Sequence, residues 1–119
     1  MQLRCVIVDD DDAFLDVARA SLEREGVIVA GVARSRAEAV RSVERLRPDA
    51  VLIDIRLGAE SGFDAARDLA VGAYPASLVM ISSYTEEDYA DLIAESPVAG
   101  FLPKTELSAG ALRRVLGMS

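Results

Sequence analysis

The fold of this chain is decided by one stretch near its middle, Ala50-Val51-Leu52-Ile53-Asp54-Ile55-Arg56-Leu57-Gly58. Four apolar residues, rich in β-formers, lead into a single carboxylate, and a loop that contains glycine follows. Such a continuous apolar run is typical of a strand buried on both faces, as in a parallel sheet. Asp54 would then lie at the carboxyl end of the strand, where ligands gather in open α/β sheets. Because aspartate is also common in turns, the other strand ends must decide whether this one belongs to a site.

Length and composition limit the class of protein. The chain has 119 residues, 51% of them apolar, which indicates a single domain over residues 1–119 with a real core. No apolar stretch approaches the ~20 residues of a membrane span, and the N-terminus lacks the pattern of a signal peptide. The sequence has one cysteine, Cys5, which cannot form an internal disulfide. We therefore expect a cytoplasmic protein that does not bind a membrane.

The charged residues exclude further functions. The sequence has no histidine, which excludes histidine-based acid–base catalysis, histidine metal ligands and a phosphohistidine carrier. Thirteen Lys and Arg against twenty Asp and Glu give a formal net charge of −7. Because nucleic-acid binding depends on basic surfaces, we expect no direct nucleic-acid binding by this domain.

Strand-like and helix-like segments alternate along the chain. We expect strands at residues 3–8, 27–33, 50–54, 77–82 and 99–102, and a loop at 55–62. The predicted helices lie between and after these strands, and their apolar positions are, in chain order, Phe14, Val17, Ala18 and Leu22; Val40, Val43 and Leu46; Phe63, Ala66, Leu69 and Ala70; Tyr89, Ala90 and Ile93; and Leu107, Ala111 and Val115. Ser35 and Ser61 are the expected N-caps of the second and third helices, and Gly26 ends the first. The fourth helix has the weakest apolar stripe, so we expect it to be loosely held.

Five strand–helix alternations with short connections predict an α/β fold, a three-layer sandwich around a five-stranded parallel sheet. The first strand ends at Asp9 and Asp10, the third at Asp54, the fourth at Ser82, and the fifth beside Lys104. Since parallel strands end at one edge of a sheet, these side chains converge if their strands are neighbours.

The residue types at this edge suit a phosphoryl group beside a divalent ion. Three carboxylates without histidine form a hard-oxygen site of the kind Mg²⁺ prefers. A lysine can pair with an anionic oxygen, and a serine hydroxyl can donate to one. A carboxylate can itself act as the nucleophile and form an acyl phosphate. Four strand ends carrying this matching set indicate a site for phosphoryl transfer.

The chain resembles the receiver domain of a response regulator in two-component signalling, over essentially its whole length. The order and spacing of its motifs agree with that family: Val8-Asp9-Asp10, Leu52-Ile53-Asp54-Ile55-Arg56-Leu57, Gly62, Ile81-Ser82-Ser83 and Gly100-Phe101-Leu102-Pro103-Lys104. The resemblance implies the flavodoxin-like strand order 2-1-3-4-5.

The resemblance also implies a phosphoryl group on Asp54 with Mg²⁺ beside it. Asp10 and Asp54 would bind the ion directly, together with the backbone carbonyl of Arg56, and Asp9 would act mostly through water. Lys104 would pair with the phosphoryl oxygens. The protein would then be a signalling phosphoacceptor that promotes only its own phosphorylation and dephosphorylation.

A sensor histidine kinase is the implied phosphodonor. Ser82 would be the switch hydroxyl and Phe101 the switch aromatic, acting on the surface of the fourth helix, fifth strand and fifth helix. A homodimer formed on phosphorylation is a further implied partner. Residues 55–57, directly after Asp54, and residues 102–107 around Lys104 resemble receivers of the NarL/LuxR-type subfamily, which precede a helix-turn-helix domain that regulates transcription. We expect no effector domain in this chain.

Four positions depart from the common pattern of the family. Gly58 stands where proline is usual, so the loop after Asp54 is expected to be more mobile. Ser61 replaces a frequent acid, and Phe101 replaces the commoner tyrosine. Thr105 follows Lys104 where many members have proline, which excludes a cis Lys–Pro bond. None of these changes removes a reactive group.

Two other functions share parts of this pattern. A small phosphatase or phosphotransferase could use Asp54 as its nucleophile, but the Asp-x-Asp-x-Thr pattern of such enzymes is absent, since Arg56 stands in place of the second acid. A flavin-binding module has the same strand order, but its phosphate loop is rich in Ser, Thr and Gly. Here that loop is formed by residues 9–12, four acids that would repel a phosphate.

Overall fold

The computed structural model describes residues 2–118, and for Glu86 the backbone alone. Five parallel strands form its main sheet: β1 (Arg4–Val8), β2 (Ile28–Ala33), β3 (Ala50–Asp54), β6 (Ser77–Ser82) and β7 (Gly100–Pro103). Their spatial order is β2-β1-β3-β6-β7, which is the order 2-1-3-4-5 when the five strands are counted along the chain. The predicted α/β fold and strand order are therefore confirmed.

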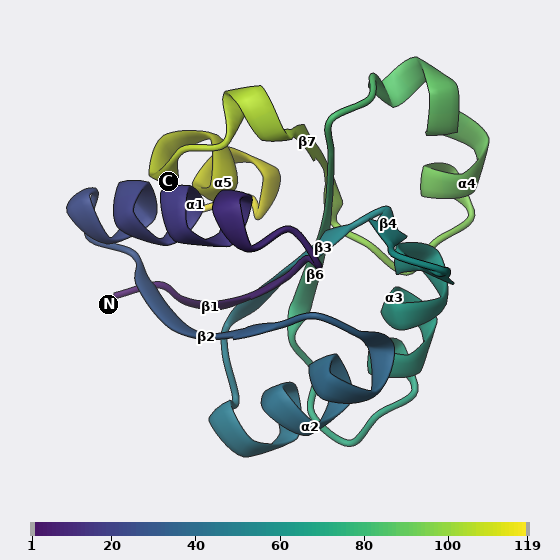
Figure 1. Ribbon diagram of the computed structural model, residues 1–119, viewed down its shortest axis with the longest axis horizontal. Helices are drawn as coiled ribbons and strands as arrows, with labels where there is room; N and C mark the ends of the chain where they lie inside the picture. The colour runs from purple at the N-terminus through teal and green to yellow at the C-terminus, as the bar shows by residue number, and fades with distance from the viewer. Residues whose placement is uncertain (1, 119) are drawn as a thin grey trace.

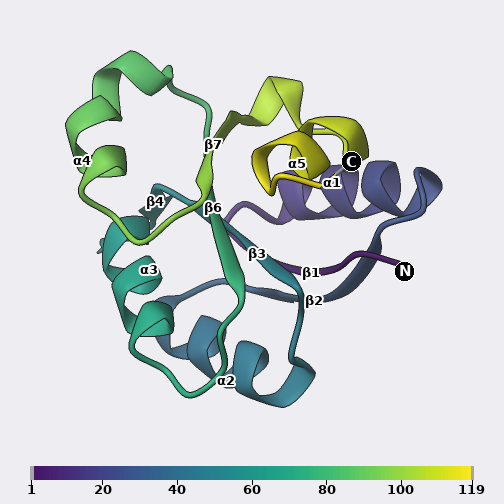
Figure 2. The ribbon, with the colours of Figure 1, turned by 180° about the vertical axis from the view of Figure 1, so that it is seen from behind.

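Helices cover both faces of this sheet, so the three-layer architecture is also confirmed (Figure 1). α1 (Asp12–Arg24) and α5 (Ala109–Val115) pack on one face, in a core that includes Leu22, Leu52 and Leu112. α2 (Arg36–Leu46) and α3 (Gly62–Ala70) pack on the other, in a core that includes Val43 and Ile53. Figure 2 shows the same two layers from behind.

The stretch around Asp54 occupies the centre of the sheet. β3 pairs with β1 on one side and with β6 on the other, and all five of its residues are buried. A strand in that position needs apolar side chains on both faces, which is why residues 50–53 show no alternation with polar ones. The carboxyl ends of β1, β3, β6 and β7 consequently meet at one edge.

The helix ends follow the capping rules. Ser35 accepts a hydrogen bond from the Glu38 N–H at the start of α2, and Ser61 accepts one from the Phe63 N–H at the start of α3. Gly26 follows α1 with a φ of +89°, the left-handed conformation that favours glycine after a helix. Among residues 2–118, no helix is both long enough and apolar enough to span a membrane.

Some local expectations are wrong. Val17 was expected on the apolar face of α1, but its side chain is 69% exposed, and Ala70 of α3 is exposed as well. Residues 55–62 are not only a loop, because β4 (Arg56–Leu57) and β5 (Glu60–Ser61) form a short antiparallel hairpin. A two-residue strand is too short to show any periodicity in sequence.

The segment after β6 is less regular than the other helices. It forms a 3-10 turn, η1 (Glu86–Tyr89), followed by the short α4 (Ala90–Ala94). A second 3-10 turn, η2 (Lys104–Glu106), lies between β7 and α5. α4 buries none of its residues, which agrees with the expectation that this helix is loosely held.

Candidate functional site

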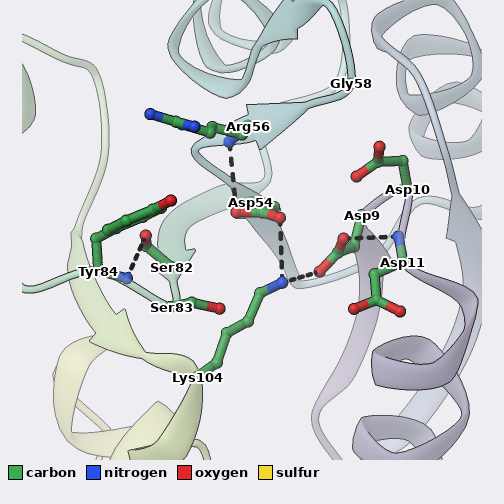
Figure 3. Close-up of a pocket in the computed structure, with 10 residues that line it drawn as sticks. All are labelled: Asp9, Asp10, Asp11, Asp54, Arg56, Gly58, Ser82, Ser83, Tyr84 and Lys104. Carbon is green, nitrogen blue, oxygen red and sulfur yellow. Dashed lines mark hydrogen bonds and ion pairs between the residues drawn. The ribbon is translucent and has the colours of Figure 1, made fainter.

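A pocket of about 330 Å³ opens at the sheet edge where β1, β3, β6 and β7 end. Figure 3 shows the residues that line it: Asp9, Asp10, Asp11, Asp54, Arg56, Gly58, Ser82, Ser83, Tyr84 and Lys104. Six of the seven predicted site residues are among them. The seventh, Phe101, lies in β7 but does not line the pocket.

Lys104 joins two buried carboxylates at the floor of this pocket (Figure 3). Its Nζ lies 3.1 Å from Asp54 Oδ2 and 2.6 Å from Asp9 Oδ2. Asp9 is completely buried at the end of β1, and Asp54 is buried at the end of β3. The lysine thus places one positive charge between two negative ones in a site largely shielded from water.

The four acids after β1 divide into two roles. Asp9 and Asp10 line the pocket together with Asp54, and each can direct a carboxylate oxygen to a common point, since these oxygens lie within 4.8 Å of one another. Asp11 is the N-cap of α1, where its side chain accepts from the N–H groups of Ala13 and Phe14. Asp12 is the first residue of that helix. Asp11 and Asp12 therefore belong to the start of α1.

The opposite rim is built by residues that follow β3 and β6. The Arg56 N–H donates to Asp54 Oδ1 at 3.4 Å, and its guanidinium lies 5.0 Å from the centre of the Tyr84 ring. Ser82 is buried, and its hydroxyl oxygen accepts from the Tyr84 N–H at 2.9 Å. The structure therefore brings Ser82 to the pocket but gives its hydroxyl oxygen a backbone partner.

Gly62 has a steric reason to be glycine. Its N–H donates to the Ile55 carbonyl at 2.7 Å, which closes the β4–β5 hairpin against the end of β3. A Cβ atom at this position would collide with the backbone carbonyl of Asp54. Any larger residue would therefore displace the segment that carries the central carboxylate.

Comparison with known proteins agrees with this geometry. The sequence model of the response regulator receiver domain matches residues 5–116. The chain belongs to this family.

Its relatives include both enzymes and a transcriptional regulator. The chain is 34% identical over 110 residues to a protein-glutamate methylesterase/protein-glutamine glutaminase of Pyrococcus horikoshii, an alignment covering 87% of this chain and 29% of that protein. It is 31% identical over 114 residues to the transcriptional regulatory protein DegU of Brevibacillus brevis, covering 93% of this chain and 47% of that protein. The chain thus spans less than half the length of these relatives.

Solved receiver structures superpose on nearly the whole chain. The signal receiver domain of a modulated diguanylate cyclase from Desulfovibrio desulfuricans G20 is 31% identical, with a TM-score of 0.81, covering 98% of this chain and 92% of that one. The signal receiver domain of the response regulator NarL from Mycobacterium tuberculosis is 26% identical, with a TM-score of 0.83 and 98% coverage of both chains. NarL-type receivers are therefore among its structural neighbours.

The electrostatics of this receiver's pocket are those of a crowded acidic site. Burial, together with the charge of Asp9, raises the pKa of Asp54 to about 6, although Lys104 acts to lower it. Burial opposes the charged form of Lys104, but contact with Asp9 and the charge of Asp54 outweigh it, so the pKa of Lys104 is raised. The lysine stays charged while the acids repel one another.

The pocket fits a divalent cation. Among the described residues, Asp9 Oδ2 is a fully buried carboxylate oxygen without an aligned hydrogen-bond donor, although the Lys104 ammonium lies close to it. Such an oxygen retains lone pairs that a cation can use. Asp9, Asp10 and Asp54 together offer the oxygen ligands that Mg²⁺ prefers, and receiver domains generally bind this ion.

Phe101 has a different setting from the one its predicted role suggests. Its side chain is only 9% exposed and packs in the apolar core on the side of α2 and α3, with Tyr89 and Ile93 against the same core. A switch aromatic is expected to rotate inward on phosphorylation, but the Phe101 ring is already inside. The switch role of Phe101 stays a prediction.

Besides Asp11 and Gly58, two further pocket residues were not predicted as site residues, Ser83 and Tyr84. Both follow Ser82 in the loop after β6, where no periodic pattern marks a side chain as inward or outward. The Arg56–Tyr84 contact joins β4 to the loop after β6, 28 positions along the chain, so only the fold reveals it.

Proposed function

We propose that this receiver accepts a phosphoryl group on Asp54 from a sensor histidine kinase, in a reaction that requires Mg²⁺. The observation that carries the proposal is the contact of the Lys104 ammonium with both Asp9 and Asp54, in a pocket that a third acid, Asp10, also lines. Family membership supports the same role, because receiver domains interact with sensor histidine kinases in two-component signalling.

The transfer is a displacement at phosphorus. A carboxylate oxygen of Asp54 forms a bond to the phosphorus atom while the bond from phosphorus to the donor's nitrogen breaks, which leaves the electron pair on that nitrogen and an acyl phosphate on Asp54. Lys104, already 3.1 Å from Asp54 Oδ2, pairs with an oxygen of the arriving group. Asp10, Asp54 and the Arg56 carbonyl would hold Mg²⁺, with Asp9 contributing mostly through water, and the ion would supply charge neutralisation.

Ser82 and Phe101 carry the consequence of this reaction to the surface. The phosphoryl oxygens offer the Ser82 hydroxyl a charged acceptor, so this hydroxyl turns toward them and donates a hydrogen bond. The move leaves room behind the hydroxyl, which changes how Phe101 and the neighbouring Tyr89 pack beside η1–α4. The surface of η1–α4, β7 and α5 then favours a homodimer or an attached effector.

The output we propose is control of transcription through an attached or separate helix-turn-helix domain. DegU supports this choice, because it is a transcriptional regulatory protein and this chain matches 47% of its length. The methylesterases that the chain also matches make an enzymatic output the competing outcome.

Intact-mass measurement after incubation with acetyl phosphate and Mg²⁺ tests the proposal. We expect one phosphoryl adduct, its loss in Asp54→Ala, and its retention in Asp88→Ala, which removes an exposed acid of η1. Chelation of Mg²⁺ should abolish the adduct. An adduct that persists in Asp54→Ala at the same yield would overturn the assignment.

A Mg²⁺ titration separates the acids after β1. Asp10→Asn should weaken Mg²⁺ binding more than Asp11→Asn, because asparagine preserves the N-cap of α1 that Asp11 provides. Equal losses of Mg²⁺ affinity in the two variants would contradict the assignment of Asp10, rather than Asp11, as a metal ligand.

A further inference from the structure

The ammonium of Lys104 has a third neighbour that the phosphoacceptor chemistry does not explain. Its Nζ lies 4.3 Å from the centre of the Phe14 ring, on the side of the lysine formed by α1. Phe14 also lines a groove of about 80 Å³ between α1 and the segment after β7, together with Val17, Leu107 and Lys104 itself. The lysine thus lies between two carboxylates and an aromatic ring.

Such a ring attracts a cation. The face of an aromatic ring is negative, and an ammonium within about 6 Å of its centre is held electrostatically, more strongly where water is excluded. The side chain of Lys104 is only 12% exposed, so this contact is largely desolvated. A leucine of similar volume could fill the space but could not hold the charge.

The acidic run that forms the site also fixes the position of this ring. Asp9 Oδ1 accepts from the Asp11 N–H at 2.9 Å, and Asp11 Oδ1 accepts from the Phe14 N–H at 3.3 Å. Two consecutive hydrogen bonds therefore connect a carboxylate of the pocket to the residue that carries the ring. The first turn of α1 places Phe14 against Lys104 as part of the same local structure.

We propose that Phe14 is a positioning residue for the phosphorylation of Asp54, acting through a cation–π contact with Lys104. The ring restricts the ammonium to the volume beside Asp9 and Asp54, and keeps water from its α1 side. The charge is then already in place when a phosphoryl group arrives, so less reorganisation is needed in the transition state. This inference rests on the proposed phosphoacceptor function.

The test is the initial rate of Asp54 phosphorylation by acetyl phosphate and Mg²⁺ in a series at position 14. Phe14→Leu removes the negative ring face and should slow the reaction about fivefold, the equivalent of about 1 kcal/mol at 1.36 kcal/mol per tenfold. Phe14→Tyr keeps the ring and should restore a rate near wild type. Val17→Ala, an exposed position of the same groove, is the matched control and should leave the rate unchanged.

Fluorinated phenylalanines at position 14 separate charge from shape. Mono-, di- and trifluorophenylalanine keep the ring and its packing but weaken the negative face stepwise, so the rate should fall with each fluorine. This series stays informative even if Phe14→Leu folds poorly.

The outcomes are distinct. If the wild-type protein accepts no phosphoryl group, both the proposed function and this inference are overturned. Normal phosphorylation with equal rates in Phe14→Leu and Phe14→Tyr would overturn the inference alone. A loss in Phe14→Leu with no trend across the fluorinated series would assign Phe14 a packing role and also overturn it.

Discussion

α2 and the η1–α4 segment are both surface helices of this receiver, yet they are held very differently. α2 is capped by Ser35 and buries Ala39, Ser42 and Val43 against the sheet. The caps of η1 and α4 make no side-chain hydrogen bond to the backbone, and α4 buries no residue. Figure 1 shows α2 lying along the sheet, whereas α4 stands away from it.

The difference assigns the two segments different roles. An element with few buried contacts can unfold or shift locally at a low cost in free energy. Such elements are therefore the ones that move when a site signals to the surface. η1–α4 lies between β6, which ends at Ser82, and β7, which is followed by Lys104. The end of β6 that leads into the weakly held segment therefore lies at the proposed phosphorylation site, whereas the other end of the segment leads to the start of β7 at the opposite edge of the sheet. A phosphoryl group that supplies the usual coupling of about 1–3 kcal/mol can shift such a segment while leaving α2 in place.

The largest contrast should appear in thiol labelling. Burial of Cys5 in β1 raises the pKa of its thiol to about 12, so below that pH it is neutral and enclosed. In the Leu92→Cys variant the new thiol is on α4, at a position 48% exposed, and should react like a free thiol. We expect labelling at pH 8 to be at least about a thousandfold slower at Cys5, because its exposure requires global unfolding.

The loss of stability at alkaline pH is the control that tests whether Cys5 is buried as a neutral thiol. Since its folded pKa lies above the ordinary 9.0, the buried neutral thiol contributes stability that is complete below pH 9 and is lost as the pH rises to about 12. Cys5→Ala removes this contribution. Rapid labelling of Cys5 in the folded protein at pH 8 would show that the sheet opens as easily as α4.

Truncation of one side chain in each helix tests the contrast in packing. Val43 of α2 is 2% exposed, and Val43→Ala should lower the free energy of unfolding by about 2 kcal/mol, from two lost methyl groups and the cavity they leave. Leu92→Ala on α4 should change it by less than about 0.5 kcal/mol. Urea denaturation measures both, and equal losses would mean that α4 is packed as firmly as α2.

Removal of the capping hydroxyls should give a smaller contrast. Ser35→Ala loses the hydrogen bond from the Glu38 N–H, 3.2 Å long, and should cost about 1 kcal/mol. Thr85 precedes η1 without capping it, and its hydroxyl donates a hydrogen bond to the side chain of Asp88. Thr85→Ala should therefore cost no more than about 0.3 kcal/mol by the same denaturation measurement. A larger loss of stability in Thr85→Ala than in Ser35→Ala would mean that η1 has the stronger N-cap.

The sequence predicts the sheet better than the surface, for a physical reason. β3 and β6 are flanked by other strands and covered on both faces, so unbroken apolar runs mark them directly. Val17 carries an apolar side chain at helical spacing but faces solvent, and spacing alone cannot distinguish the edge of an apolar stripe from its centre. The β4–β5 hairpin was missed because each of its strands has only two residues, too few to repeat the two-residue alternation of a strand.

The candidate site follows the same division. The convergence of Asp9, Asp54 and Lys104 follows from parallel topology and could be predicted from strand ends alone. Complete burial of Asp9 beside the exposed Asp10 could not, since both follow β1 in an uninterrupted run of acids. The contact of Phe14 with Lys104 joins α1 to the end of β7, so it emerges only from the packing of the two segments.

Amide hydrogen exchange with and without beryllofluoride, in the presence of Mg²⁺, tests most directly whether phosphorylation of Asp54 acts on η1–α4. Beryllofluoride mimics the phosphoryl group on that aspartate. We predict altered exchange from Ser82 to Leu107 and little change in α2, Arg36–Leu46. Changes confined to the loops that touch Asp54, or equal changes in α2, would contradict the proposed switch.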